Sequence, residues 1–250
     1  MLIVCIGDDP ANDSYIATLE RTGGTTGIVI NVERLSKDVS AHEVRDRLSH
    51  AGADENVHGI LLQQPLPPNL SIRAIADSMP IHKDVDGTHP TNQGHLAFGR
   101  QPEFVPATPA AVMALLERSP SWPLAGRHAV MIGRSAVVGL PVATLLIAQN
   151  ATVTVLHSKS TSLQPYTQLA EVVIVAVGKP GFITGSMIAQ GATVIDVGTT
   201  PVDGEMKGDV DFESAFEMAG AITPVPGGVG PVTNMTLLRN VLKAAEGRLR

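Results

Sequence analysis

A turn bordered by glycines is the first place in this sequence where chemistry is expected. The apolar run 128–132 leads into residues 133–139, GRSAVVG, and a helical pattern follows. Such a turn presents backbone N–H groups, and the start of the helix adds partial positive charge, which suits the pyrophosphate of a dinucleotide. The pattern departs from G-x-G-x-x-G, because Ser135 replaces the second glycine, Val138 the third, and Gly139 comes one position late. An ordinary strand-to-helix turn is the alternative.

The residues after the next expected strand indicate which dinucleotide would bind. NAD enzymes usually have a carboxylate here for the ribose hydroxyl, but this chain has Leu156-His157-Ser158-Lys159. No acid would repel a 2′-phosphate, Ser158 can donate to it, and Arg134 can pair with it. We therefore predict NADP rather than NAD. For His157 and Lys159, a solvated surface position is the alternative.

Three further segments combine polar or rigid residues that packing does not explain. Residues 57–67, VHGILLQQPLP, end an apolar run at Gln63, whose amide could bind a heterocycle or simply cap the strand. Asp84 and Asp86 could be turn residues of the D-G type. Residues 223–233, TPVPGGVGPVT, form a rigid loop suited to close backbone approach.

Alternating elements would position the predicted dinucleotide site. From Ala125 onward, β-branched runs alternate with helical patterns, which predicts a doubly wound parallel sheet. Since the runs are apolar nearly throughout, helices should cover both faces. Strands are expected at 128–133, 152–156, 172–177 and 193–198, and helical segments at 137–150 and around 162–170.

The first hundred residues repeat this alternation less clearly. Strands are expected at 2–7, 27–33 and 57–64, and helices at 40–50, 71–78 and 110–117. Ser40 and Glu43 form a capping-box pattern. A terminal helix at 234–247 would present Leu237, Leu238, Val241 and Leu242 on one face and return to the first domain. We predict an α/β protein with a substrate domain of residues 1–112 plus 234–250 and a Rossmann-like domain of residues 113–233.

Composition excludes several classes of function. The chain has 250 residues, of which 44% are hydrophobic and 17% charged, and its net charge is −6. Because no run of Lys or Arg forms a basic stripe, neither nucleic acid nor an anionic membrane is an expected partner. A single cysteine, Cys5, fits a reducing, cytoplasmic location. No metal site is expected, because the histidines show no i, i+4 pairing with one another.

A series of segments covering nearly the whole chain resembles the methylenetetrahydrofolate dehydrogenase/methenyltetrahydrofolate cyclohydrolase family. In order, they are GDDPANDSY, GILLQQPLP, KDVDGTHPTNQG, FVPATP, GRSAVVGLP, TVTVLHSKS, IDVG and PVPGGVGPVT. The resemblance implies a homodimer whose subunits bind a tetrahydrofolate derivative between their two domains. It also implies two reactions: hydride transfer from the methylene carbon to NADP, then addition of water to give 10-formyltetrahydrofolate.

The resemblance assigns roles to particular residues. It implies that Tyr15 stacks beside the folate, that Gln63 lies next to the reacting centre, and that Asp86 binds the pterin ring. For Tyr15, packing beneath the loop is the alternative. The loop expected to close over the substrate contains Pro226, Gly227 and Gly228. The expected cofactor-binding residues are Thr108, Gly133, Arg134, Ser135, Val138, Gly139, His157, Ser158, Val177, Gly178, Val197 and Gly198.

One departure from the family bears directly on activity. Four residues after the tyrosine, the family has a lysine that is central to the cyclohydrolase step, and this chain has Leu19. Leucine cannot move a proton. Arg21 is a poor substitute, because it points about 200° away on a helix and stays protonated. Asn12 and Ala107 also replace the usual serine and cysteine.

Three hypotheses follow from these observations. The leading hypothesis is an NADP-dependent dehydrogenase whose cyclohydrolase activity is weakened or lost. The second is a fully bifunctional enzyme in which another group or a positioned water replaces the lysine. The third is a non-catalytic relative that binds folate or nucleotide.

Overall fold

The structure is a computed structural model that describes residues 1–8 and 10–247. It divides into two compact units, Met1–Ala107 with Asn234–Arg250, and Thr108–Thr233. The predicted boundary after residue 112 lies inside helix α4 (Ala107–Leu116), five residues beyond the division between the units.

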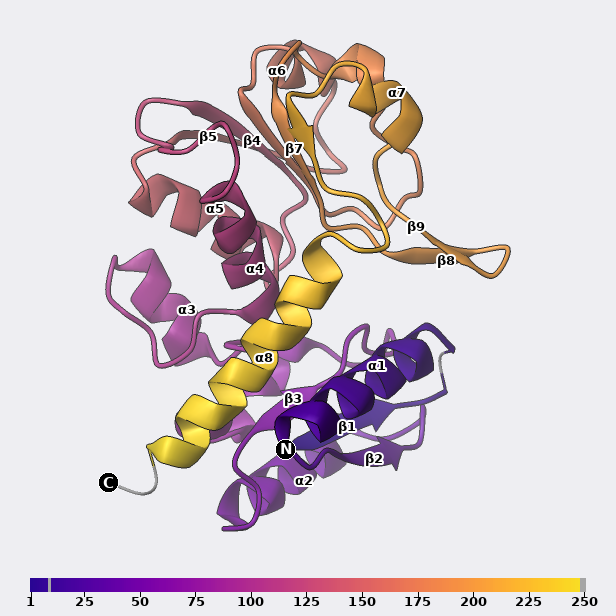
Figure 1. Cartoon of the computed structure of the whole chain (residues 1–250). Coiled ribbons are helices and arrows are strands. Elements are labelled where there is room, and N and C mark those ends of the chain that lie inside the picture. Colours follow the sequence, from indigo (N-terminus) through magenta and orange to yellow (C-terminus); the bar gives the residue numbers. More distant parts are fainter. Residues whose placement is uncertain (9, 248–250) are drawn as a thin grey trace. The chain divides into compact units, whose positions relative to one another are not determined.

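The first unit is built on a parallel sheet in the order β2-β1-β3. Its strands are β1 (Leu2–Ile6), β2 (Asn31–Leu35) and β3 (Ile60–Leu62), and its longer helices are α1 (Pro10–Thr26), α2 (Ala41–Ala53) and most of α8 (Val229–Glu246) (Figure 1). Successive side chains of a strand point to opposite faces. Ile3 and Cys5 therefore join a core with α1 and α8, whereas Val4 joins a core with α2.

The helices predicted between the strands of the first unit are confirmed in one case and not in another. The capping box at Ser40 and Glu43 is confirmed at the start of α2. The helix predicted at 71–78 is wrong, because that stretch forms the two 3₁₀ turns η1 (Ile72–Ala74) and η2 (Ala76–Ser78). A third turn, η3 (Ile81–Lys83), and the helix α3 (Pro90–Ala97) follow.

Helix α8 begins five residues before the predicted start, at Val229 rather than Asn234. Leu237, Val241 and Ala244 are spaced by four and three residues and enter the core of the first unit. The predicted return of the terminal helix to the first domain is confirmed. Leu242 does not share the buried face, because it is 54% exposed.

The second unit is a doubly wound parallel sheet in the order β10-β7-β6-β4-β5. The strands are β4 (His128–Ile132), β5 (Thr152–Leu156), β6 (Val172–Val175), β7 (Thr193–Asp196) and β10 (Ala221–Ile222). The connections include α4, α5 (Gly139–Ala148), α6 (Gln164–Thr167), η4 (Gly185–Met187), α7 (Phe212–Phe216) and a hairpin of β8 (Thr200–Val202) with β9 (Glu205–Lys207).

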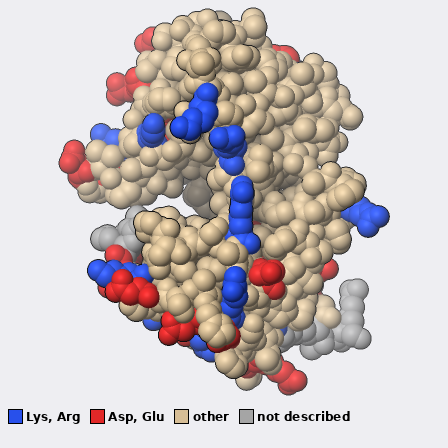
Figure 2. Space-filling view, turned by 180° about the vertical axis from the view of Figure 1, so that it is seen from behind, with Lys and Arg blue, Asp and Glu red and all other residues tan. Residues whose placement is uncertain are grey.

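Alternate residues of β4 show why this sheet is covered on both faces. Ala129 and Met131 pack in one core with residues of α4 and α5, whereas Val130 and Ile132 pack in another with residues that include Ala215 of α7. The predicted two-domain α/β fold with parallel sheets is confirmed. No helix in the described part of the chain has both the length and the apolar character needed to cross a membrane. On the face drawn in Figure 2, uncharged surface predominates and charges of both signs are present.

Candidate cofactor pocket and substrate-binding residues

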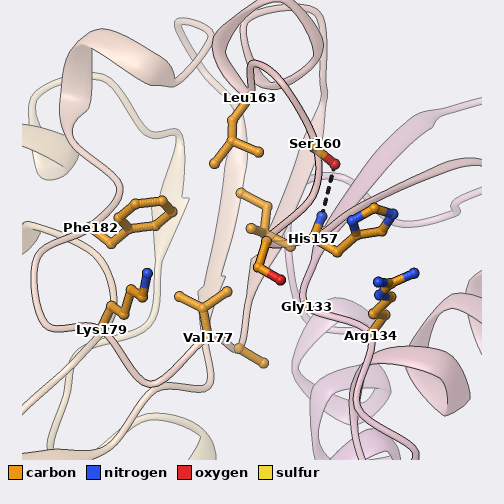
Figure 3. A pocket seen from close by; sticks show the side chains of 11 residues that line it. Gly133, Arg134, His157, Ser160, Leu163, Val177, Lys179 and Phe182 are labelled. Carbon is orange, nitrogen blue, oxygen red and sulfur yellow. Dashed lines mark hydrogen bonds between the residues drawn. The ribbon is translucent and has the colours of Figure 1, made fainter.

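A pocket of about 350 Å³ opens at the carboxyl ends of β4, β5 and β6. The chain passes from β4 to β5 on one side and then crosses back to β6 on the other side of β4, so the strand order reverses at β4. Open α/β sheets bind ligands at such a switch point. The lining residues are Ile132, Gly133, Arg134, His157, Ser158, Ser160, Leu163, Ala176, Val177, Lys179 and Phe182. Figure 3 shows Arg134 and His157 on one side of the pocket and Lys179 and Phe182 on the other.

The predicted glycine turn forms one edge of this pocket. Gly133 has a φ of +122°, and a Cβ there would lie 2.3 Å from the carbonyl oxygen of Ala176. A Cβ on Gly139 would lie 2.3 Å from the oxygen of Gly133. Both positions therefore require glycine, because a side chain would open the turn.

Two backbone N–H groups of the turn donate hydrogen bonds within the turn itself. The N–H groups of Val138 and Gly139 donate to Ser135 Oγ at 3.2 and 3.3 Å. The Ser135 hydroxyl thus occupies these two donors at the start of α5, and the expectation that the turn presents N–H groups to phosphate stays a prediction. Arg134 is exposed beside the turn and lines the pocket.

The opposite edge of the pocket is the segment after β6. The N–H groups of Val177, Gly178 and Lys179 all donate to the carboxylate of Asp209, at 2.6, 2.9 and 2.6 Å respectively. These donors are therefore engaged within the protein, and Val177 and Lys179 contribute their side chains to the pocket wall. Sequence reasoning missed Asp209, which lies 32 residues from Val177.

Five of the predicted cofactor-binding residues line the pocket: Gly133, Arg134, His157, Ser158 and Val177. The others are not part of its lining: Thr108, Ser135, Val138, Gly139, Gly178, Val197 and Gly198. The pocket also has lining residues that the sequence did not single out: Ile132, Ser160, Leu163, Ala176, Lys179 and Phe182.

The donor set and shape of the pocket fit a dinucleotide. Arg134, His157 and Lys179 supply N–H groups for phosphate oxygens, while Leu163 and Phe182 supply an apolar wall for a ring. At Gly133 a Cβ would clash with the carbonyl oxygen of Ala176, so the absence of a side chain there keeps this edge of the pocket open. Fold and pocket together define the second unit as a dinucleotide-binding α/β domain.

The predicted substrate residues of the first unit include a coupled pair, Tyr15 on α1 and Asp86 after η3. Burial, together with the charge of Asp86, raises the pKa of Tyr15 well above its ordinary value. Burial and the charge of Asp84 raise the pKa of Asp86 to about 7, against the effect of a hydrogen bond from the Ala107 N–H. At neutral pH Tyr15 thus keeps its proton and can donate a hydrogen bond.

Asp84 has a structural role that differs from that of Asp86. It is fully buried, and its carboxylate accepts hydrogen bonds from the N–H groups of Thr88 and His89 and from Asn92 Nδ2. These bonds hold the turn that leads into α3, so the turn-residue interpretation is confirmed for Asp84. Gly87, which follows Asp86, has a φ of +67° and would bring a Cβ within 2.6 Å of the nitrogen of Pro106.

Gln63 follows β3 and is 8% exposed. Its Nε2 donates to Asn12 Oδ1 at 3.1 Å and to the Gln64 carbonyl oxygen at 2.9 Å. Asn12 and Tyr15 lie three residues apart on α1, so Gln63 is tied to the helix that carries the tyrosine.

Leu19 is completely buried and belongs to the apolar core of the first unit. Tyr15 packs against the same core, one helical turn away. The position therefore holds a packing residue with no group that can exchange a proton.

The loop residues Pro226, Gly227 and Gly228 lie in the second unit, between β10 and α8. Gly227 has a φ of +106°, and a Cβ on Gly228 would lie 2.5 Å from the oxygen of Pro224. Both glycines are thus required by the loop itself. The other predicted substrate residues, Tyr15, Gln63 and Asp86, belong to the first unit.

Comparison with known proteins identifies the family. Residues 1–86 match the model of the tetrahydrofolate dehydrogenase/cyclohydrolase catalytic domain, and residues 106–249 match the model of that family's NAD(P)-binding domain. Bifunctional protein FolD of Roseiflexus sp. (strain RS-1) is 48% identical over 251 residues, covering 100% of this chain and 86% of the relative. The protein of the same name from Staphylococcus aureus (strain Newman) is 42% identical, covering 98% and 86%. The chain therefore belongs to the tetrahydrofolate dehydrogenase/cyclohydrolase family.

Solved structures agree with this membership. Bifunctional FolD from Campylobacter jejuni has a TM-score of 0.92 and 40% identity, covering 99% of this chain and 88% of that one. The FolD of Trypanosoma brucei, complexed with NADP cofactor and an inhibitor, also has a TM-score of 0.92, with 35% identity and coverage of 100% and 87%.

Proposed function

We propose that this protein is an NADP-dependent 5,10-methylenetetrahydrofolate dehydrogenase whose cyclohydrolase activity is weakened or lost. The single observation that carries the finer part is Leu19, a fully buried core residue at the position where the family resemblance leads us to expect a lysine. The dehydrogenase part is supported by family membership and by the dinucleotide pocket of the second unit.

In the dehydrogenase step, bound NADP supplies the acceptor for a hydride from the methylene carbon of the substrate. The protein's task is to bind and align the reactants. Arg134 and Ser158 are proposed to bind the 2′-phosphate, because both line the pocket and no carboxylate lines it. The apolar side chains of Leu163, Val177 and Phe182 line the same pocket and offer contacts to a ring of the dinucleotide.

The first unit is proposed to hold the pterin part of the substrate. Asp86 can accept hydrogen bonds from pterin N–H groups when it is ionised. Tyr15 keeps its proton at neutral pH, because burial and the neighbouring charge of Asp86 hold its pKa high. It therefore offers an O–H donor and a ring face to the substrate. Gln63, fixed by Asn12, would lie next to the reacting centre.

The hydrolytic step needs a group that helps water add to the methenyl carbon and then transfers a proton. Leu19 cannot do this. The resemblance implies that Gln63 would assist a lysine at this position, but here the Gln63 amide donates to Asn12 Oδ1 and to the Gln64 carbonyl oxygen. The proposed enzyme therefore releases 5,10-methenyltetrahydrofolate as its main product.

The fully bifunctional enzyme is the second candidate. It is favoured by the 48% identity to a relative that is named as bifunctional. In this case Tyr15 or a positioned water would replace the lysine.

The two candidates differ in the products they form. The purified protein is incubated with 5,10-methylenetetrahydrofolate and NADP, and NADPH, methenyl and 10-formyl products are quantified separately without acid, which would close the formyl product back to methenyl. We expect methenyl product in near-equal amount to NADPH at early times. Formyl product that keeps pace with NADPH would establish the bifunctional enzyme instead, and an absence of NADPH would favour a non-catalytic relative.

Two proposals concern the cellular form: a cytoplasmic location, which the single cysteine favours, and a homodimer joined through the second unit, which the resemblance implies. Light scattering at micromolar concentration tests the dimer, and a mass equal to one chain would contradict it.

A further inference from the structure

Two buried carboxylates lie behind the dinucleotide pocket, at Asp196 and Asp209. Asp209 is completely buried and Asp196 is 3% exposed, yet neither lines the pocket. No ion pair to either carboxylate forms among residues 1–8 and 10–247. Burying a carboxylate without a cation is unfavourable unless hydrogen bonds replace the lost water, so these two residues require an explanation.

Asp209 organises the segment after β6. Its Oδ2 accepts from Val177 and Gly178, and its Oδ1 accepts from Lys179, so three consecutive N–H groups converge on one carboxylate. The Asp209 carbonyl also accepts from the Ile183 N–H at 3.0 Å. Both ends of the 177–183 segment are thus fixed to one residue.

Asp196 in turn supports Asp209. Its Oδ1 accepts from the N–H groups of Gly198 and Asp209 at 2.9 and 3.0 Å, and its Oδ2 accepts from Val210 at 2.9 Å. A hydrogen-bonded chain therefore runs from the end of β7, through Asp196 and Asp209, to the segment after β6.

Two glycines leave room for these carboxylates. A Cβ on Gly208 would lie 2.0 Å from Asp196 Oδ2, and a Cβ on Gly198 would lie 2.3 Å from Asp209 Cγ. Since any larger residue would displace a carboxylate, the local sequence is built around the pair.

The segment that Asp209 holds forms one wall of the pocket. Val177, Lys179 and Phe182 all line it, and Lys179 Nζ lies 5.4 Å from the centre of the Phe182 ring (Figure 3). We propose that Asp209, supported by Asp196, is a positioning residue that fixes this wall for NADP. This inference rests on the proposed function only in taking NADP as the ligand of the pocket.

A carboxylate is needed because both of its oxygens accept. Asparagine offers one oxygen and turns an NH₂ group toward an N–H donor. Asp209→Asn therefore leaves at least one of the three backbone donors without an acceptor and loosens the wall. NADP would then have to order the segment when it binds, which weakens affinity without altering the reacting groups.

The test compares Asp209→Asn with the matched control Asp203→Asn, which removes the same charge from an exposed turn at a φ of +52° that asparagine tolerates. NADP binding is measured by calorimetry well below the unfolding temperature, with KM for NADP and kcat from initial rates. We expect about tenfold weaker NADP binding and a higher KM for Asp209→Asn. At saturating NADP, kcat and KM for the folate substrate should stay near wild type, and the control should be unchanged throughout.

Each outcome decides a different point. Wild type that does not bind NADP would overturn the proposed function, and this inference with it. Wild type that binds NADP, with Asp209→Asn binding equally well, would overturn the positioning role alone. If Asp209→Asn does not fold, Asp196→Asn decides, because it keeps the Asp209 carboxylate and removes its support. We expect Asp196→Asn to weaken NADP binding relative to wild type, and unchanged binding in Asp196→Asn would contradict the proposal.

Discussion

At the scale of single residues, Leu19 is the position on which the proposed loss of hydrolysis rests. The side chain is fully buried beside Ile16 in the core, one turn from Tyr15. General acid–base groups contribute about 10²- to 10⁴-fold to a reaction. The absence of such a group at position 19 is the basis of the proposal that hydrolysis is weakened or lost in this protein.

Introducing lysine at this position should restore hydrolysis. We expect Leu19→Lys to raise the rate of methenyl hydrolysis at least about tenfold, while it lowers stability because a charge enters an apolar core. The exposed neighbour Thr18 provides a control, Thr18→Lys, that adds the same charge outside the core. Hydrolysis is measured by the loss of methenyl substrate per folded molecule, with the folded fraction taken from circular dichroism. A folded Leu19→Lys enzyme with unchanged hydrolysis would exclude Leu19 as the cause.

Arg134 is expected to select NADP over NAD. Removing its guanidinium in Arg134→Ala should weaken NADP binding about tenfold or more, since hydrogen bonds to charged groups contribute about 1.5–3 kcal/mol, and should change NAD binding little. Arg118→Ala, which removes an exposed positive charge from the same unit outside the pocket, is the control. Calorimetry with each nucleotide gives the ratio. An equal loss for both nucleotides would assign Arg134 to the shared pyrophosphate rather than to the 2′-phosphate.

The pKa of Asp86 predicts a pH dependence of substrate capture. Burial and Asp84 raise the pKa of Asp86 to about 7, so its ionised fraction grows as the pH rises through that value. If the ionised form accepts from the pterin, kcat/KM for the folate substrate should rise with pH around 7. Asp86→Asn should lower kcat/KM and remove this limb of the profile. A wild-type profile that is flat between pH 6 and 8 would contradict the assignment.

At the scale of elements, the carboxylate of Asp196 at the end of β7 holds two loop segments by accepting hydrogen bonds from their backbone N–H groups. Burial raises the pKa of Asp196 to about 6, partly offset by N–H groups that include those of Val210 and Asp209. Because the folded state then holds the proton more tightly than the unfolded state, this group stabilises the fold at low pH. That contribution is lost as the pH rises from about 4 through about 6.

The pKa of Asp196 predicts how the stability difference between wild type and Asp196→Asn changes with pH. The free energy of unfolding of wild type minus that of Asp196→Asn should fall as the pH rises from 4 to 7. Urea titrations of both proteins at several pH values measure it. A difference that rises over this range would show that the pKa of Asp196 is lowered in the folded state.

Sequence patterns predicted the elements best where the signal is local. The β-branched runs of the second unit predicted the four longer strands of its sheet, because strands covered by helices on both faces are mostly apolar along their length. The start of α8 was missed because residues 227–231 are rich in glycine and proline, although proline is tolerated in the first turn of a helix. Leu242 was predicted to lie on the buried face of α8 but is exposed, whereas Ala244 is buried in the core of the first unit.

At the scale of the whole molecule, contacts between distant residues limited what could be predicted. The glycine turn was recognisable because its residues are consecutive. Asp209 was not, because its three donors lie about thirty residues away and only the fold brings them together. Lys83 is a second case: it is fully buried, with Nζ donating to the carbonyl oxygens of Gly52 and Asp54 at the end of α2.

Taken as one enzyme, the chain combines a dinucleotide domain of the expected form with a substrate unit that lacks the expected lysine. Relatives of the same family are named as bifunctional. We therefore propose that dehydrogenation and hydrolysis, which these relatives are named as combining, are separated in this protein.

The most direct test supplies 5,10-methenyltetrahydrofolate to the purified protein without NADP and follows its disappearance near neutral pH. The same preparation must form NADPH from 5,10-methylenetetrahydrofolate in a parallel assay, which establishes that the enzyme is active. We predict that the methenyl compound decays no faster than in buffer alone. Decay that accelerates in proportion to enzyme concentration would contradict the account.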